Sequence, residues 1–248
     1  MGGATPTVWC HSRCSTNLLA GFGLVDQART VSKNSTAAKC TDIGQHQLSG
    51  QTTVTGMTGK TYWLIGASEG LGRALAKELN AAGARVVISA RNGERLKSLK
   101  AELTDVRILT LDVTDVASVR RAAMVIGPVD GIIYNAGAYE PMHATDWDSG
   151  TALNICDVNF TGALRVLGEI VPKFVEAGQG DITLIGSLAG YRGLPAAIGY
   201  GASKAAMISL AETMRHDLKD TGVVVRIVNP GFIETRLTQK NDFRMPML

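Results

Sequence analysis

Lys60 to Gly72, KTYWLIGASEGLG, is the stretch that decides the fold of this chain. Residues 60–66 form a short apolar run of residues that favour β-structure, and the run stops at glycine, which predicts a buried strand. The apolar residues that follow recur at helical spacing up to Gly83, which predicts a helix. A strand, a glycine-rich turn and a helix in this order predict an anion site, because backbone N–H groups and the helix N-terminus face the anion.

The same turn fits a second pattern. Gly66-Ala67-Ser68-Glu69-Gly70 matches the G-x-S-x-G nucleophile elbow of hydrolases, in which Ser68 would be the nucleophile. Such an elbow needs an acid and then a histidine further along the chain. The downstream histidines are His143, in a predicted loop, and His216, deep in a predicted helix. Neither has the order and loop context of a triad, so a hydrolase is kept only as a distant alternative.

Strands and helices alternate through the rest of the chain. Strands are predicted over residues 85–90, 106–111, 129–134, 180–185 and 222–228. Helices are predicted over residues 92–103, 116–125, 149–175 with an interruption at Pro172, and 197–219. The alternation predicts an α/β fold, a three-layer doubly wound parallel sheet of Rossmann type, with ligands at the carboxyl ends of the strands.

Two charged residues follow predicted strands. Arg91 lies just beyond the second strand, where a dinucleotide fold faces the adenosine ribose. An acid there would bind the 2′-hydroxyl, whereas an arginine accommodates a 2′-phosphate, so NADP is expected in preference to NAD. Asp112 could accept a hydrogen bond from the adenine amino group or cap the next helix, although Asp115 is the better cap for residues 116–125.

A serine, a tyrosine and a lysine are grouped around the fifth predicted strand and the helix after it. Ser187 lies thirteen residues before Tyr200, and Lys204 lies four residues after that tyrosine. If Tyr200 to Lys204 opens a helix, the ammonium lies one turn from the phenol and should lower its pKa from about 10. Tyr200 is then a usable general acid and base.

These motifs together resemble the short-chain dehydrogenase/reductase family over residues 57–248. The family's T-G-x-x-x-G-x-G motif corresponds to residues 65–72, with Ile65 in the threonine position and glycines at Gly66, Gly70 and Gly72. Its Asn-Ala-Gly motif corresponds to residues 135–137, and its Asn-Ser-Tyr-Lys tetrad to Asn159, Ser187, Tyr200 and Lys204. The order of the motifs and the intervals between them also agree with the family.

The resemblance implies an NADP-dependent oxidoreductase that interconverts a carbonyl and a secondary alcohol. It gives Tyr200 the proton transfer, Ser187 the orientation of the substrate oxygen, and Lys204 the nicotinamide ribose. Asn159 would support a water-linked proton path to the lysine. The further cofactor contacts that it implies are Gly66, Ser68, Gly70, Leu71, Gly72, Arg91, Asp112, Asn135, Ala136, Gly137, Pro230, Gly231, Ile233 and Thr235. It also implies a homodimer or homotetramer, and a small-molecule substrate whose pocket is lined by the residues between Ser187 and Tyr200.

Composition excludes other function classes. The 248 residues carry a net charge of only +3, with no basic cluster interleaved with aromatics, which argues against nucleic-acid binding. No apolar run approaches the ~20 residues that span a membrane. Four cysteines are too few for a disulfide scaffold, which favours a reducing, cytoplasmic compartment. Cys10, His11 and Cys14 lack a second ligand pair, so no metal site is expected.

The two ends of the chain depart from the family pattern. Residues 1–56 are rich in Ser, Thr, Gly and Gln, and we interpret them as a disordered extension or a segment outside a domain that starts at Met57. Residues 243–248 look like a stop inside the substrate loop, after which the family continues into a last edge strand. An incomplete pocket would leave the alternative function, a dinucleotide-binding protein without turnover.

A chain that lacks its last edge strand should be weakly stable. We expect thermal unfolding near or below room temperature, measured by circular dichroism. A melting temperature of about 45–65 °C, typical of mesophile domains, would contradict this expectation.

Overall fold

The computed structural model describes residues 9–10, 56–231 and 233. The strands of these residues form one seven-stranded sheet in the order β1-β7-β6-β5-β2-β3-β4, in which every neighbouring pair is parallel. The strands are β1 (Trp9–Cys10), β2 (Thr61–Ile65), β3 (Arg85–Ser89), β4 (Val106–Ile108), β5 (Gly131–Tyr134), β6 (Gly180–Ile185) and β7 (Val223–Pro230). The predicted Rossmann-type α/β fold is confirmed.

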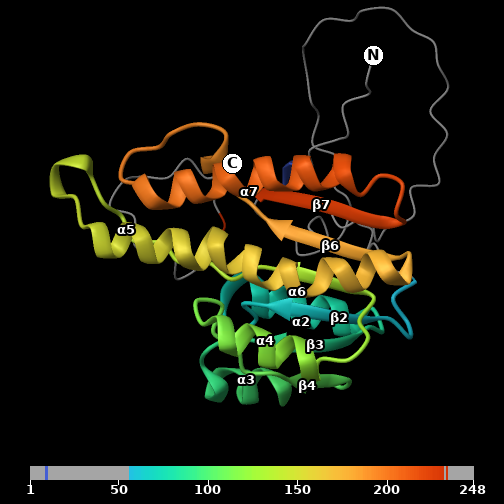
Figure 1. Ribbon diagram of the computed structural model, residues 1–248. Coiled ribbons are helices and arrows are strands. Elements are labelled where there is room, and N and C mark those ends of the chain that lie inside the picture. Colours follow the sequence, from blue (N-terminus) through green and yellow to red (C-terminus); the bar gives the residue numbers. More distant parts are fainter. Residues whose placement is uncertain (1–8, 11–55, 232, 234–248) are drawn as a thin grey trace, which may run out of the picture.

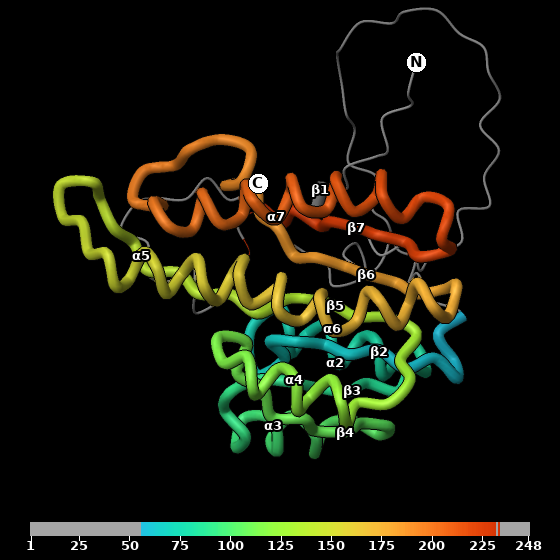
Figure 2. The backbone as a smooth tube through the Cα atoms, in the orientation of Figure 1, coloured from blue at the N-terminus to red at the C-terminus, as the bar shows by residue number. Residues whose placement is uncertain are grey.

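Helices cover both faces of this sheet (Figures 1 and 2). The α-helices are α2 (Gly70–Ala81), α3 (Gly93–Lys100), α4 (Val116–Val125), α5 (Ser149–Cys156), α6 (Gly162–Ala177) and α7 (Ile198–Asp217). The shorter helices are η1 (Ala144–Asp146), the π-helix η2 (Asp157–Thr161) and η3 (Leu188–Gly190). In both figures α4 and α6 lie in front of the sheet and α2 lies behind it.

The core consists of two layers because successive residues of each strand point to opposite faces. Trp63 and Ile65 of β2 pack in the layer under α4, α6 and α7. Tyr62 and Leu64 pack in the layer under α2 and α3. A strand that is buried on both faces reads as a continuous apolar run, which is why residues 60–66 could be identified as a strand.

The register of the strands brings their carboxyl ends to one edge of the sheet. Ile65 at the end of β2 lies opposite Ser89 of β3 and Tyr134 of β5. Ile185 at the end of β6 lies opposite Val228 of β7. The turns that follow these residues therefore meet, and these turns carry most of the predicted site.

Short polar side chains set several helix starts. Asp115 accepts a hydrogen bond from the backbone N–H of Ala117 at 2.8 Å, which confirms the predicted cap of α4. Asn92 caps α3 in the same way by accepting from the N–H of Arg95 at 3.0 Å. At the other end of a helix, Gly178 takes the left-handed conformation (φ 64°) that ends α6.

The predicted interruption at Pro172 is wrong, since α6 continues through it to Ala177. Pro172 and Gly168 are both exposed. The carbonyl of Gly168, four residues earlier, can therefore bond to water instead of to a backbone N–H. The helical stretch changes instead at residues 157–161, where one π-helical turn separates α5 from α6.

The strand β1 lies within residues 1–56, for which the sequence analysis assigned no element. Trp9 lies opposite Asn229 and Cys10 opposite Pro230, so this two-residue strand pairs with the edge of β7. The predicted stop at residues 243–248 lies outside the described residues.

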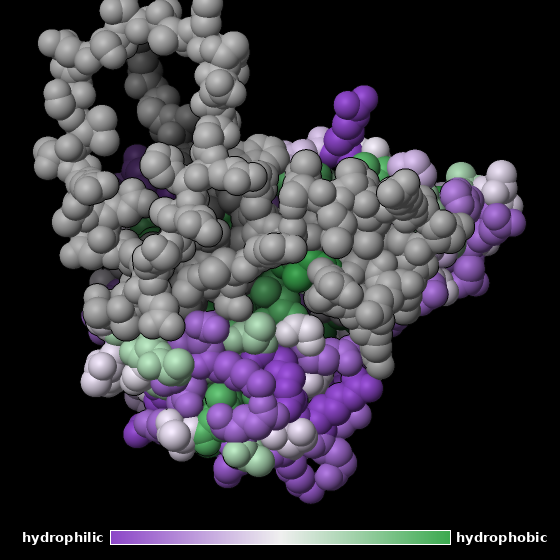
Figure 3. Space-filling model, turned by 180° about the vertical axis from the view of Figure 1, so that it is seen from behind, coloured by the Kyte–Doolittle hydropathy of each residue, from purple (hydrophilic) through white to green (hydrophobic). Residues whose placement is uncertain are grey.

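Figure 3 shows the face of the molecule opposite to that of Figure 1. Seen from behind, the lower part of the molecule is largely hydrophilic, and apolar side chains are visible above it (Figure 3). None of the helices in residues 56–231 is long and apolar enough to cross a membrane. The same search of the described residues finds no group of three or more potential metal ligands.

Candidate active site

A cleft of about 310 Å³ lies at the carboxyl ends of β2, β5, β6 and β7. Most of the residues predicted for the site line it. These residues are Gly66, Ser68, Gly70, Leu71, Arg91, Asn135, Ala136, Gly137, Ser187, Tyr200, Lys204, Pro230, Gly231 and Ile233. The structure thus brings together residues that are up to 167 positions apart in the chain, from Gly66 to Ile233 (233 minus 66).

The glycine turn between β2 and α2 is closely packed against neighbouring backbone. Gly66 has a φ of +88°, and a Cβ on it would lie 2.5 Å from the backbone nitrogen of Ala136. A Cβ on Gly72 would lie 2.0 Å from the carbonyl oxygen of Gly66. Gly72 therefore does not line the cleft but packs behind it, where only glycine lets the helix approach the turn.

Asn135 ties this turn to the end of β5. Its Nδ2 donates to the carbonyl oxygen of Gly66 at 2.8 Å, and its own backbone N–H donates to the carbonyl of Ile65 at 2.9 Å. Within the described residues, no side chain caps the N-terminus of α2. The backbone N–H groups of that first turn are therefore suited to an anion beside Gly70 and Leu71.

Two arginines stand at the far end of the cleft, beyond β3. Arg91 and Arg95 both line it, and Asn92 lies between them. The guanidinium of Arg95 forms an ion pair with Glu69 of the glycine turn, with 2.6 Å between Nη1 and Oε2. The turn and the first residues of α3 are thus connected across the mouth of the cleft.

Asp112 does not line the cleft, because its side chain is used locally. One carboxylate oxygen accepts hydrogen bonds from the backbone N–H of Thr114 at 2.9 Å and from its hydroxyl at 2.7 Å. Burial acts to raise the pKa of Asp112, but these two bonds and the nearby Arg91 and Arg165 bring it below its usual value. The carboxylate stays ionised, and its hydrogen bonds with Thr114 close a local turn. The predicted contact of Asp112 with adenine stays a prediction.

Asn159 lies in the π-helical turn and is fully buried. Its Oδ1 accepts from the N–H of Ala138 at 2.6 Å, and its Nδ2 donates to the carbonyl of Ala138 at 3.1 Å and to the Ser203 hydroxyl at 3.0 Å. The side chain therefore fastens the segment after Asn-Ala-Gly to α7. This gives a packing reason for an asparagine in the middle of a helical stretch.

Ser187, Tyr200 and Lys204 come together where β6 ends and α7 begins. Lys204 is only 5% exposed, and its ammonium donates to the carbonyl of Ile185 at 2.7 Å. The same nitrogen lies 5.7 Å from the centre of the Tyr200 ring. Ser187 caps η3 by accepting from the N–H of Ala189 at 3.2 Å, so its hydroxyl proton is available for another partner.

The predicted lowering of the Tyr200 pKa is wrong in this structure. Burial raises the pKa of the phenol, and its hydrogen bond with the side chain of Ser187 offsets only part of that rise. Desolvation also lowers the pKa of Lys204, to about 8. Desolvation is the largest cause of both shifts, because each charged form loses more solvation than its contacts return.

Sequence reasoning missed two residues beside this group. The ring of Tyr139 makes an edge contact with Tyr200, with 5.0 Å between ring centres. Asn229 accepts a hydrogen bond from the backbone N–H of Ser187 at 3.1 Å. A polar residue at the end of a buried strand, just before Pro230-Gly231, was the available signal for Asn229; its neighbours in space could not be read from the chain. Thr235 lies outside the described residues.

The hydrolase alternative finds no support in this geometry. Ser68 lines the cleft, whereas His143 and His216 are both exposed and neither lines it. His216 lies near the end of α7, far along the helix from Tyr200.

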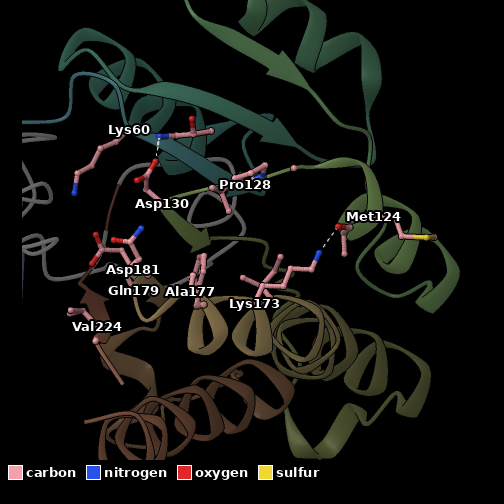
Figure 4. A pocket seen from close by; sticks show the side chains of 17 residues that line it. Lys60, Met124, Pro128, Asp130, Lys173, Ala177, Gln179, Asp181 and Val224 are labelled. Carbon is pink, nitrogen blue, oxygen red and sulfur yellow. Dashed lines mark hydrogen bonds between the residues drawn. The ribbon is translucent and has the colours of Figure 1, made fainter. Parts of the chain in front are cut away.

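A larger hollow of about 670 Å³ lies at the amino ends of the strands, between α4 and α6 (Figure 4). Three of its charged side chains have partners within the protein. Lys173 donates to the carbonyl of Ala123 at 2.7 Å, Asp130 accepts from the N–H of Thr61 at 2.7 Å, and Asp181 pairs with Arg226 at 2.5 Å. None of the predicted site residues lines it, so its size does not make it the active site.

Comparisons with known proteins agree with this geometry. The model of the short chain dehydrogenase family matches residues 60–245. An uncharacterized oxidoreductase of Myxococcus xanthus is 36% identical over 200 residues, which cover 77% of this chain and 79% of the relative. The 3-oxoacyl-[acyl-carrier-protein] reductase FabG of Rickettsia prowazekii is 32% identical over 187 residues, with 74% and 77% covered.

Two solved structures are similar over most of their length. A 3-ketoacyl-(acyl-carrier-protein) reductase from Brucella melitensis, complexed with NADH, has a TM-score of 0.71 at 26% identity and covers 75% of this chain and 80% of its own. A gluconate 5-dehydrogenase from Burkholderia cenocepacia, in complex with NADP and tartrate, has a TM-score of 0.69 at 26% identity, with 73% and 74% covered.

The depressed pKa of Lys204 predicts a pH-dependent stability. Because its folded pKa of about 8 lies below the 10.5 of the unfolded chain, the unfolded state binds more protons between these values, and stability rises with pH there. In the cofactor-free protein, the free energy of unfolding of the wild type relative to Lys204→Met should rise by roughly 2–3 kcal/mol from pH 8 to 10.5. Urea unfolding at several pH values measures it.

Lys173→Met is the matched control, because Lys173 also donates to a backbone carbonyl but its side chain is exposed. Between pH 8 and 10.5, the free energy of unfolding of the wild type should rise relative to Lys204→Met but not relative to Lys173→Met. An equal rise relative to both variants, or no rise relative to Lys204→Met, would show that burial of Lys204 does not cause the pH dependence.

Proposed function

This chain belongs to the short-chain dehydrogenase family, and we propose that it is an NADP-dependent oxidoreductase that interconverts a carbonyl and a secondary alcohol. Family membership makes it an NAD(P)-dependent dehydrogenase or reductase. The observation that carries the fuller proposal is that Ser187, Tyr200 and Lys204 line the same cleft as the glycine turn.

The residues around the glycine turn fit a dinucleotide. Missing side chains at Gly66 and Gly70, together with the uncapped first turn of α2, leave backbone N–H groups for a pyrophosphate. Lys204 and Tyr200, at the other end of the cleft, would hold the nicotinamide ribose. When bound, the dinucleotide supplies or accepts the hydride, and the protein supplies position and electrostatics.

Tyr200 holds the proton that the substrate oxygen needs. The raised pKa of its phenol keeps it protonated at neutral pH, which is the form that donates a proton to a carbonyl oxygen during reduction. The Ser187 hydroxyl, hydrogen-bonded to the phenol, orients the same oxygen.

Lys204 keeps a positive charge beside the site at neutral pH, since its pKa of about 8 lies above 7. Within the described residues this buried ammonium donates to one acceptor, the carbonyl of Ile185, and an ammonium carries three donors, so ligand hydroxyls or water can bind to it as well. Burial of the Lys204 ammonium costs solvation free energy, which favours a functional role for this lysine over a purely structural one.

The preference for NADP rests on the arginines at the adenosine end. Arg91 and Arg95 line the cleft together, and a guanidinium binds a phosphate with paired hydrogen bonds. The similar structures include one with NADP and one with NADH, so the preference has to come from this chain's own residues. A dimer or tetramer, and a cytoplasmic location, stay predictions of the family resemblance and the cysteine content.

A carbonyl screen tests the proposed function. Purified protein with NADPH should reduce at least one member of a panel of ketones, 4-nitroacetophenone, 2-octanone, ethyl acetoacetate and an acetoacetyl thioester, followed at 340 nm. Tyr200→Phe should lower kcat by about 10²–10⁴-fold, because it removes the proton donor.

Tyr62→Phe is the control, because it also removes a phenol hydroxyl, one that donates to Asp181 away from the cleft. Its kcat should stay near that of the wild type. NADPH binding without reduction of any panel member would favour the dinucleotide-binding protein without turnover. Equal activity of Tyr200→Phe and the wild type would contradict the role of Tyr200.

Cofactor choice is tested at Arg91. Arg91→Asp should weaken NADPH binding by about 10–100-fold, because a charge-assisted hydrogen bond of roughly 1.5–3 kcal/mol is lost and a like charge is added. Binding of NADH should change little or improve. Fluorescence titration with both dinucleotides measures this, and Arg85→Gln, at the opposite end of β3, is the control. An unchanged ratio of the two affinities would contradict NADP selection by Arg91.

A further inference from the structure

We propose that Asn229 is a positioning residue for Ser187, and that it works by holding both ends of the turn from Ser187 to Tyr191. This inference deepens the proposed function and rests on it, because Ser187 matters in this way only if it orients a substrate oxygen. It concerns a residue that the sequence motifs did not identify.

The side chain of Asn229 bridges two parts of that turn. It is 1% exposed and lies near the end of β7. Its Oδ1 accepts from the backbone N–H of Ser187 at 3.1 Å, and its Nδ2 donates to the phenol oxygen of Tyr191 at 2.8 Å. A single planar amide therefore fixes the first residue of the turn by its backbone and the last by its side chain.

The absence of a side chain at Gly186 leaves room for the Asn229 amide. A Cβ on Gly186 would lie 2.0 Å from Oδ1 of Asn229, so any larger residue would push the amide away. Gly186 is itself held in the sheet, since its N–H donates to the carbonyl of Val228 at 2.8 Å. The side-chain amide of Asn229 consequently lies against Gly186. It holds the backbone of Ser187, the next residue, in a fixed position relative to β6 and β7.

The turn between the two anchors is short and internally bonded. Ser187 accepts from the N–H of Ala189, and the N–H of Tyr191 donates to the carbonyl of Leu188 at 3.1 Å. Such a turn moves as a unit. Loss of the bridge would let the turn tilt and would move the Ser187 hydroxyl relative to the Tyr200 phenol, to which it is hydrogen-bonded.

The bridge also connects Ser187 to the surface of the molecule. The residue Tyr191 is 48% exposed, although its phenol oxygen accepts a hydrogen bond from the buried side-chain amide of Asn229. Because a buried amide left without its acceptor is costly, Asn229 favours the position of Tyr191 that keeps this bond. Ser187 is then placed by the same amide that holds Tyr191.

The experiment compares Asn229→Leu, Asn229→Asp and Tyr191→Phe with the wild type. With NADPH and the panel carbonyls, Asn229→Leu should lower kcat by about 10–100-fold, the range expected when a positioned group is displaced by a fraction of an ångström or more. Tyr191→Phe should lower it by less, roughly 3–10-fold, because only one of two bonds is lost. Asn229→Asp keeps the acceptor for Ser187 and should recover most of the activity.

Two further readouts separate positioning from general damage. The dissociation constant of NADPH should stay within about 3-fold of the wild type, since Asn229 does not line the cleft. Hydrogen exchange of the Ser187 amide, followed by NMR, should become faster in Asn229→Leu and stay slow in Asn229→Asp. Asn80→Leu is the structural control, because Asn80 also makes several bonds to backbone but lies near the C-terminal end of α2, away from the glycine turn.

The outcomes distinguish this inference from the proposed function. If Asn80→Leu lowers kcat as much as Asn229→Leu, or if Asn229→Leu keeps full kcat and a slow-exchanging Ser187 amide, the inference is wrong. If the wild type reduces none of the carbonyls, the proposed function fails, and the exchange rate of the Ser187 amide alone decides whether Asn229 holds the turn.

Discussion

The close approach of two backbone segments, the glycine turn at Gly66 and the end of β5 at Ala136, is the constraint on which the structure of the site depends. A Cβ at Gly66 would lie 2.5 Å from the backbone nitrogen of Ala136, so the two segments touch with no side chain between them. Asn135 then closes the contact by donating to the carbonyl of Gly66. The cleft exists because backbone atoms, rather than side chains, form its floor at this contact.

A second constraint acts at the other end of the cleft, where the charged side chain of Lys204 is buried. Lys204 loses most of its hydration and retains one protein acceptor, the carbonyl of Ile185. Such an arrangement lowers stability at neutral pH, as its depressed pKa indicates. The glycine turn and Lys204 thus define the two ends of one site. The first offers backbone N–H groups suited to phosphate, and the second holds a buried ammonium beside Tyr200.

Much of this could be predicted from the sequence because the relevant signals are local. Strand runs that end at glycine or at a polar residue, alternating with helices, predicted a parallel sheet, and parallel strands place their carboxyl ends together. The intervals between Asn159, Ser187, Tyr200 and Lys204 then identified the residues that converge. What failed depends on burial or on distant neighbours. The Tyr200 pKa was expected to fall because only its neighbour along the helix was visible, whereas desolvation dominates it.

Other differences have the same origin. The continuity of α6 through Pro172 depends on exposure of the carbonyl four residues earlier, which no local pattern shows. The π-helical turn at Asn159 follows from contacts with Ala138 and Ser203, which lie 21 and 44 residues away. Asn229 was missed because its partners, Ser187 and Tyr191, are set by the pairing of β6 with β7.

The most direct test of the central claim is NADPH binding to a matched pair of helical glycine variants. Gly72→Ala places a methyl group 2.0 Å from the carbonyl of Gly66, whereas Gly168→Ala on α6 meets nothing within 4 Å. Fluorescence titration should show an affinity at least about 10-fold weaker for Gly72→Ala and unchanged for Gly168→Ala, a difference of roughly 1.4 kcal/mol or more. Equal affinity for NADPH in both variants, or none in the wild type, would contradict the account.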